Sequence, residues 1–347
     1  MHNRVSAEPS SQTLDHDVVL SVDALTTQIA TSRGRFDAVS QSSFTLRRGE
    51  ALAMVGESGS GKSITCHSII GLIEAPAAVS GGRALFRRRN GKVVDLLAQD
   101  DRGLRDLRGA EIAMVAQDPT GSLNPVLTIG AQLREIAARH LKLSRRDADT
   151  LSLELLTKVG IADPALRLRQ YPHQLSGGMR QRVMIAMALV CRPSLLIADE
   201  ATTALDVTIQ AQILELFRDL KAGADQTAFL LVTHNMGVVA EIADRVLVMY
   251  AGRIVEAGDV DAVLRAPRHP YTRALLRCIP SGDGTASHGR IASIPGSAPD
   301  PQSRPPGCAF APRCASAIAA CTEADPDLED TGSGRLVRCF RWRELAA

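Results

Sequence analysis

A glycine-rich loop with a single lysine is the first feature of the sequence that could carry chemistry. The segment GESGSGKS at residues 56–63 has the spacing G-x-x-x-x-G-K-[ST]. Loop amides can converge on phosphate oxygens because glycine has no Cβ, and the helix predicted next adds its positive N-terminal end. Lys62 can then bridge the β- and γ-phosphates, and Ser63 can place its hydroxyl on Mg²⁺. The residues expected to line this nucleotide site are Gly56, Glu57, Ser58, Gly59, Ser60, Gly61, Lys62, Ser63 and Ile64.

The alternative for this segment is a chance glycine–serine turn. The apolar run ALAMV at residues 51–55 directly precedes the loop, and SITCHSIIGLI at residues 63–73 has the pattern of a helix. A strand, a glycine-rich loop and a helix in this order are the context that a phosphate loop requires. The sequence therefore favours nucleotide binding.

Two carboxylates follow a second apolar run, SLLIADE at residues 194–200. Ligands bind at the carboxyl ends of strands in open α/β sheets, and this run ends in Asp199 and Glu200. We expect Asp199 to hold Mg²⁺ through water and Glu200 to polarise an attacking water molecule. The alternative is that both are solvated loop residues, but a phosphate loop in the same chain favours a shared site.

A second anion-binding element lies in LSGGMRQ at residues 175–181. Ser176 is predicted to be a helix N-cap, and Gly177 and Gly178 leave the backbone amides bare. This element is more than 100 residues from Lys62 in the sequence, and a single nucleotide cannot easily contact both. Two chains facing head to tail could do so, each offering its capped helix to the nucleotide of the other.

The composition is that of a globular protein. The chain has 347 residues, 45% of them hydrophobic and 22% charged, and a net charge of +2. This charge gives no strong attraction for nucleic acid, and no apolar run approaches the roughly 18 residues of a membrane span. The first residues lack the apolar core of a secretion signal, so we expect a disordered leader at 1–16 and a cytoplasmic protein.

The elements that must position these groups follow an α/β pattern. Short strand segments fill residues 18–55, and helical spacing dominates from about 120 to 192. The wholly apolar runs in SLLIADE and TAFLLVTH predict strands buried on both faces of a parallel sheet. A helix is expected at 209–223, and a strand–turn–strand unit at 244–258. A linker-like stretch rich in Pro, Gly and Ser then leads into the last 40 residues.

Four of the seven cysteines gather in that last part: Cys308, Cys314, Cys321 and Cys339. Disulfides are not expected in a reducing cytosol, and four thiolates suit a [4Fe–4S] cluster or tetrahedral zinc. Such a small segment with few large apolar residues would gain stability from a bound metal. The alternative is four unligated thiols, and the choice between iron–sulfur and zinc stays open.

Taken together, these motifs make the chain similar to the ATP-binding subunits of ABC transporters over about residues 18–266. GESGSGKS resembles the Walker A motif of that family, LSGGMRQ its signature motif and LLIADE its Walker B motif. AQDP contains Gln117, similar to the glutamine that contacts Mg²⁺ and senses the membrane partner. TALD contains Asp206, which matches the D-loop, and LLVTHN contains His234, similar to the histidine that contacts the γ-phosphate.

The resemblance implies a fold and a division of the chain. The fold is a P-loop NTPase cassette in the α/β class, with a RecA-like mixed sheet, an antiparallel β subdomain and an α-helical subdomain. The expected cassette covers 17–266, with the helical subdomain at about 118–190 and a small C-terminal extension at 267–347. Two positions depart from the family pattern. The adenine-stacking aromatic would fall near Ile29, with Phe36 the nearest aromatic, and Ala201 replaces a common proline.

Longer stretches resemble the oligopeptide, dipeptide and nickel importers of this family. They include DPTGSLNPVLTIGAQL, ATTALDVTIQAQIL and HPYTRALLRCIP. This branch implies an ATPase that energises uptake of peptides or a related small substrate. Its partners would be a second, homologous ATP-binding subunit in a heterodimer, two membrane permeases and, indirectly, a periplasmic or extracellular binding protein, with no nucleic acid. The expected location is the cytoplasmic face of the cell membrane, as a peripheral subunit.

Two other functions compete with this reading. A soluble ATPase of the same fold that works on DNA or the ribosome usually has two cassettes or a long coiled-coil insertion, and this chain has neither. A regulatory metal-sensing module with a vestigial ATPase is disfavoured because Glu200 is present. The cargo itself stays open among dipeptides, longer peptides, nickel complexes and opines.

Overall fold

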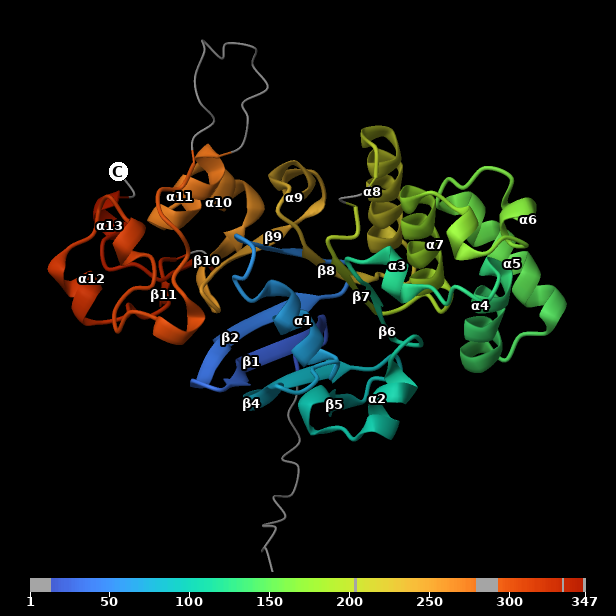
Figure 1. Cartoon of the computed structure of the whole chain (residues 1–347), viewed down its shortest axis with the longest axis horizontal. Helices are drawn as coiled ribbons and strands as arrows, with labels where there is room; N and C mark the ends of the chain where they lie inside the picture. The colour runs from blue at the N-terminus through green and yellow to red at the C-terminus, as the bar shows by residue number, and fades with distance from the viewer. Residues whose placement is uncertain (1–13, 203–204, 279–292, 333, 346–347) are drawn as a thin grey trace, which may run out of the picture.

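A computed structural model describes residues 14–202, 205–278, 293–332 and 334–345 of the chain. The predicted leader therefore lies outside the described residues, except for positions 14–16, and so does the 279–292 part of the predicted linker. Figure 1 shows an α/β protein with a helical part at one end, the C-terminal region at the other end and an antiparallel sheet below the centre. Among the helices of the described part, none combines the length and the apolarity needed to cross a membrane.

The main sheet has eight strands in the order β11-β12-β10-β9-β3-β8-β7-β6. The five strands from β9 to β6 run parallel to their neighbours, and β10, β12 and β11 continue the sheet in antiparallel fashion. The bounds of the strands in this sheet are β3 (Ala51–Val55), β6 (Ile112–Val115), β7 (Leu195–Asp199), β8 (Ala228–Val232), β9 (Arg245–Tyr250), β10 (Arg253–Asp259), β11 (Glu329–Asp330) and β12 (Leu336–Val337).

The central strands confirm the prediction that the apolar runs are strands of a parallel sheet covered on both faces. Every residue of β3, β7 and β8 is buried, as expected of parallel strands covered on both faces. The helices on the two faces include α1 (Lys62–Ile69), which follows β3, and α8 (Val207–Ala222). Gly223 ends α8, as the sequence predicts. The phosphate loop therefore leaves the middle of the sheet.

A second sheet of four antiparallel strands packs under the first, in the order β2-β1-β4-β5. Its strands are β1 (Val18–Thr31), β2 (Gly34–Arg47), β4 (Ala77–Arg87) and β5 (Val93–Asp95). The apolar side chains of this sheet form one buried cluster with those of α1 and the main sheet, including Leu20, Leu46 and Phe86. Through this cluster, α1 packs against the antiparallel sheet.

A second buried cluster joins the helical part to the main sheet and includes Leu133, Leu156 and Ile185 together with Leu196 and Phe229. The helical part contains α3 (Pro119–Ser122), α4 (Ile129–Ile136), α5 (Arg145–Lys158), α6 (Pro164–Arg167) and α7 (Gly177–Leu189). The remaining helices are α2 (Asp101–Leu107), α9 (Met236–Ile242), α10 (Val260–Arg265), α11 (Pro270–Arg277), α12 (Ala319–Glu323) and α13 (Trp342–Leu345). The fold is the expected P-loop cassette, with its RecA-like sheet, antiparallel subdomain and helical subdomain.

The C-terminal region packs directly on the cassette. Its strand β12 pairs with β10, so two short strands of this region extend the main sheet. Phe310 is buried in one cluster with Tyr250 and Tyr271, and the rings lie in edge-to-face or tilted contact. This contact brings the C-terminal region close to the end of β3 and the loop that follows it.

Candidate functional site

The phosphate loop has a backbone that only glycine can form at two of its positions. Gly56 has φ of +152°, and a Cβ there would lie 2.2 Å from the Met249 carbonyl oxygen. Gly61 has φ of +102°, and its Cβ would lie 2.7 Å from the Ala38 carbonyl oxygen. Side chains at either position would push the loop away from the sheet, so these glycines give the loop its shape.

Lys62 is buried at the start of α1, and its ammonium is held by the loop itself. Its Nζ donates to the carbonyl oxygens of Gly56 at 2.8 Å and Glu57 at 2.9 Å. Burial lowers the pKa of Lys62, while the charges of Glu200 and Asp199 oppose this shift. The lysine is thus fixed inside the loop, where a triphosphate would supply the opposite charge.

Ser63 and Asp199 meet although they are far apart in sequence. The Ser63 hydroxyl donates to Asp199 Oδ1 at 3.1 Å. Asp199 is only 2% exposed, and burial raises the pKa of its carboxyl group, while the bond from Ser63 acts in the opposite direction. A hydroxyl and a buried carboxylate side by side are an oxygen donor set that suits Mg²⁺. The residues present therefore fit the expected metal.

Glu200 connects two further predicted residues. Gln117 Nε2 donates to Glu200 Oε2 at 2.9 Å, and His234 Nδ1 lies 3.2 Å from Glu200 Oε1. Glu200 has φ of +51°, an unusual value for a residue with a side chain, and its N–H donates to the Val232 carbonyl at 2.8 Å. Backbone strain of this kind occurs at functional sites, where the surrounding structure holds it in place.

These residues lie at one edge of the sheet because of the strand order. Gln117, Asp199 and His234 follow or end β6, β7 and β8, whose carboxyl ends point the same way as the end of β3. The structure therefore brings together Lys62, Ser63, Gln117, Asp199, Glu200 and His234.

Two other predicted groups, Ser176 and Asp206, cap helices, and Gln181 of the motif that contains Ser176 donates to the Glu200 carbonyl at 3.3 Å. Ser176 caps α7, accepting from the Met179 N–H at 3.3 Å, and Gly177 next to it is exposed. Asp206 is exposed and caps α8 through the Ile209 N–H at 3.0 Å. Among the hydrogen bonds of the described residues, none connects Ser176 or Asp206 to the phosphate loop. A capped and open helix end on the surface is available to a ligand bound elsewhere.

The four C-terminal cysteines come close to one another. All four line one small cavity of about 20 Å³, next to Phe310. Burial raises the pKa of Cys308 to about 11, so its thiol is protonated at neutral pH when no metal is bound. As the side chains stand in the described residues, no three His, Cys, Asp or Glu groups form a metal-binding set. The four cysteines therefore lie near one another, but their thiols are not positioned to bind one metal ion together.

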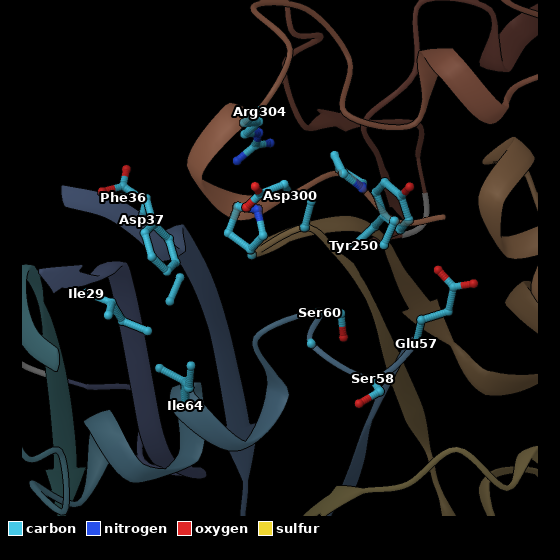
Figure 2. A pocket seen from close by; sticks show the side chains of 17 residues that line it. Ile29, Phe36, Asp37, Glu57, Ser58, Ser60, Ile64, Tyr250, Asp300 and Arg304 are labelled. Carbon is cyan, nitrogen blue, oxygen red and sulfur yellow. The ribbon is translucent and has the colours of Figure 1, made fainter. Parts of the chain in front are cut away.

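The sequence did not predict that the C-terminal region lines a cavity beside the phosphate loop. A cavity of about 230 Å³ lies beside the phosphate loop. Figure 2 shows Ile29, Phe36 and Ile64 on one side of it and Asp300 and Arg304 of the C-terminal region on another. Ile29 and Phe36 are register partners in β1 and β2, so both positions considered for adenine stacking reach this cavity. Nothing in the local sequence indicates that residues 298–304 would lie here.

Comparison with known proteins identifies the family. The ABC transporter family model matches residues 39–203, and the model for the oligopeptide/dipeptide transporter C-terminal region matches residues 255–321. A Brucella melitensis protein named "Putative peptide import ATP-binding protein" is 50% identical over 95% of this chain and 98% of its own length. The chain belongs to the ABC transporter ATP-binding family. The dipeptide transport ATP-binding proteins DppD of Bacillus subtilis and Escherichia coli are 48% and 46% identical, over 93% and 92% of this chain and 94% and 96% of their own.

Solved structures of ABC cassettes have the same fold. A dimeric post-hydrolysis structure of the cassette MJ0796 with ADP and phosphate covers 70% of this chain and 98% of its own, with a TM-score of 0.62 and 25% identity. A second dimeric structure of that cassette gives a TM-score of 0.63 at 24% identity, over the same shares of both chains. As an ABC ATPase, the chain binds and hydrolyses ATP with Mg²⁺. The strand-end group described above is the part of the chain suited to that chemistry.

Proposed function

We propose that this chain is the ATP-hydrolysing subunit of an importer that takes up peptides. The observation that carries the proposal is a likeness that extends beyond the cassette into the C-terminal region. That region matches an oligopeptide/dipeptide transporter model, and relatives named for peptide import or dipeptide transport align over nearly the whole chain. The MJ0796 cassette, by comparison, covers 70% of this chain.

We assign the chemistry to residues by their positions. The loop amides, Lys62 and Ser63 hold the triphosphate and its metal, with Asp199 acting through water and Gln117 completing the set. Mg²⁺, when bound, neutralises charge on the β- and γ-phosphates. Glu200 orients water for in-line attack, and His234 stabilises the charge that develops on the γ-phosphate.

The site is completed by a second subunit. Ser176 and Gly178 stand at an open, capped helix end that is not joined to the phosphate loop of the same chain. An ABC cassette of similar fold forms a dimer that holds ADP and phosphate. We therefore assign Ser176, Gly177 and Gly178, with Asp206 of the D-loop, to the nucleotide of the partner ATPase, and we propose that this partner is a homologous but different chain.

An apolar groove between the sheet and the helical part is a docking site for a permease. It has a volume of about 270 Å³ and is lined by Leu72, Met114, Met184 and Met187 among others, and Leu72 is 46% exposed. Ala116, next to Gln117, lies in its wall, so an occupant of the groove would touch the loop that carries Gln117. A short apolar helix of a permease at the cytoplasmic face of the membrane fits this place. The substrate would reach the permeases from an external binding protein.

We also propose that the four cysteines of the C-terminal region hold an iron–sulfur cluster or zinc. What supports this is that all four thiols line one cavity, although they are separated along the chain. The thiols would have to converge and lose their protons on binding, because no ligand set is formed as they stand in the described residues. No step of ATP hydrolysis is assigned to this metal.

The test of the function is transport in the whole complex. Cells that lack this subunit should fail to take up the peptides that the complex carries, and the wild-type chain should restore the uptake. The Lys62→Ala variant should assemble with the permeases but restore neither uptake nor ATP hydrolysis. Restored peptide uptake with Lys62→Ala, or wild-type ATPase activity that peptide and binding protein never stimulate, would overturn the proposal.

A further inference from the structure

The C-terminal region contacts the phosphate loop through a fully paired arginine. Arg313 Nη1 and Nη2 donate to the two carboxylate oxygens of Glu57 at 2.7 and 3.0 Å. Arg313 is 5% exposed at its side chain, and Glu57 is 29% exposed. This is a two-point ion pair between groups 256 residues apart, one of them inside the loop that holds the phosphates. Such a fork fixes the direction of both side chains, which a single contact would not do.

The remaining donors of Arg313 are also satisfied. Its Nε donates to the Pro295 carbonyl at 2.8 Å, Nη2 donates to the Ile294 carbonyl at 3.4 Å, and Nη1 donates to the Tyr250 hydroxyl at 3.2 Å. A guanidinium has five N–H groups, and all of them have acceptors here. The hydrogen bonds to Glu57 and Tyr250 raise the pKa of Arg313, so it is always charged. The Arg313 side chain is therefore held in one orientation by its hydrogen bonds.

Glu57 links Arg313 to Lys62, because it contacts both residues. Its backbone N–H donates to the hydroxyl of the buried Tyr271 at 2.8 Å, and its carbonyl accepts from Lys62 Nζ at 2.9 Å. The side chain, amide and carbonyl of Glu57 are thus all held, and the side chain and the amide are held by residues that follow the last strand of the cassette. A loop free to rotate at this position would turn its amides away from a phosphate.

We propose that Arg313 is a positioning residue for ATP: by fixing Glu57, it holds the phosphate loop in the shape that receives the triphosphate. The proposal rests on the nucleotide site proposed above and adds the C-terminal region to it. A second observation agrees with it, since residues 298–304 of the same region form one wall of the cavity beside the loop (Figure 2). The region that the family model names as a transporter C-terminal segment is then part of the ATP site of this chain.

The experiment measures the dissociation constant of ATP and the melting temperature of the full chain, and the KM and kcat for hydrolysis in the complex with the partner ATPase and the permeases. The variants are Glu57→Gln, Arg313→Gln, Arg313→Lys and the double variant of the two glutamines. Lysine keeps the charge but cannot form the fork. The double variant leaves no unpaired charge in the contact, so it tests the ATP site even where a single variant loses stability. Arg341→Gln is the matched control, because Arg341 pairs with the exposed Glu344 and with the Ser316 carbonyl, and it lines the cysteine cavity and not the cavity beside the loop.

We expect ATP affinity to fall about tenfold in Arg313→Gln and in Arg313→Lys, which corresponds to about 1.4 kcal/mol. KM should rise while kcat stays close to that of the wild type, because Glu200 is untouched. Glu57→Gln and the double variant should show the same tenfold loss, as expected when two residues act as one unit. Arg341→Gln should bind ATP as the wild type does.

Two results separate this proposal from the one it rests on. If the double variant binds ATP with wild-type affinity and differs only in its melting temperature, Arg313 is a structural contact alone and the inference fails while the ATPase stands. If the wild-type chain and Arg341→Gln do not bind ATP either, the nucleotide site itself is wrong, and the positioning role falls with it.

Discussion

Gln117 donates a hydrogen bond of 2.9 Å to the carboxylate of Glu200, although 83 residues separate them in the sequence. Gln117 belongs to the loop that leaves β6 and enters the helical part, and Glu200 follows β7. The residue assigned to water activation therefore touches the residue assigned to sensing the membrane partner. In the proposed importer, movement of the helical part would change this contact and so would link the permease to hydrolysis.

Glu200→Gln should bind ATP but hydrolyse it slowly. A positioned general base contributes about 10²–10⁴ in rate, and the amide cannot accept the proton of the attacking water. Gln can keep the contacts to Gln117 and His234, so binding should change little. Phosphate release and ATP titration measure the two effects separately. The exposed Glu215→Gln is the control, and full turnover in Glu200→Gln would remove the assigned base.

His234→Ala should slow hydrolysis without loss of the fold. The His234 side chain is 63% exposed and contacts Glu200, so its removal leaves no buried cavity. Loss of one group that stabilises the transition-state charge typically costs about 10²–10³ in kcat. Single-turnover measurements with saturating ATP test this. Unchanged kcat would show that Glu200 acts without the histidine.

Asp199→Asn should lower the apparent affinity for Mg²⁺ by about 10–100-fold. Losses of this size are typical when a residue that holds a metal through water is replaced. The Mg²⁺ concentration that gives half-maximal ATP hydrolysis measures this. Ser63→Ala should act in the same direction, because it removes the other member of the pair. Wild-type Mg²⁺ dependence in both variants would place the metal elsewhere.

The same aspartate gives a pH dependence of stability in the metal-free protein. Burial raises the pKa of Asp199 above its ordinary value of 3.8, so the folded chain binds this proton more tightly than the unfolded chain. Its stabilising contribution is therefore fully present below about pH 3.8 and is lost as the pH rises through the raised pKa. Asp199→Asn should be more stable than the wild type at neutral pH without Mg²⁺, as urea unfolding would measure. Lower stability of the variant under those conditions contradicts the account.

An iron–sulfur cluster bound by the four cysteines would colour the protein. Protein purified without oxygen should absorb in the visible range and should lose this absorbance in Cys314→Ser, with Cys278→Ser as the control outside the cavity. Colourless protein with one zinc per chain would favour the other metal. Protein with neither iron nor zinc would remove the metal from the account.

The positions of the strand-end groups could be predicted because each group is local in the sequence. The loop at residues 56–63 and the carboxylates Asp199 and Glu200 each follow an apolar run, and strand order then brings them together. The contacts of the C-terminal region could not be predicted. Arg313 and Glu57 are 256 residues apart, and no periodic pattern marks an arginine as the partner of one particular carboxylate. The pairing of β12 with β10 was missed because β12 is only 2 residues long.

In the proposed importer, ATP is held between two subunits. The direct measurement is a structure of the whole complex trapped with ATP and Mg²⁺ by Glu200→Gln. We expect the nucleotide on Lys62 of this chain to be closed by the signature turn of the partner ATPase, while Ser176 and Gly178 of this chain close the nucleotide of the partner. A structure in which each ATP is enclosed wholly within one polypeptide, with Ser176 facing solvent, would show that the two subunits do not share their nucleotides.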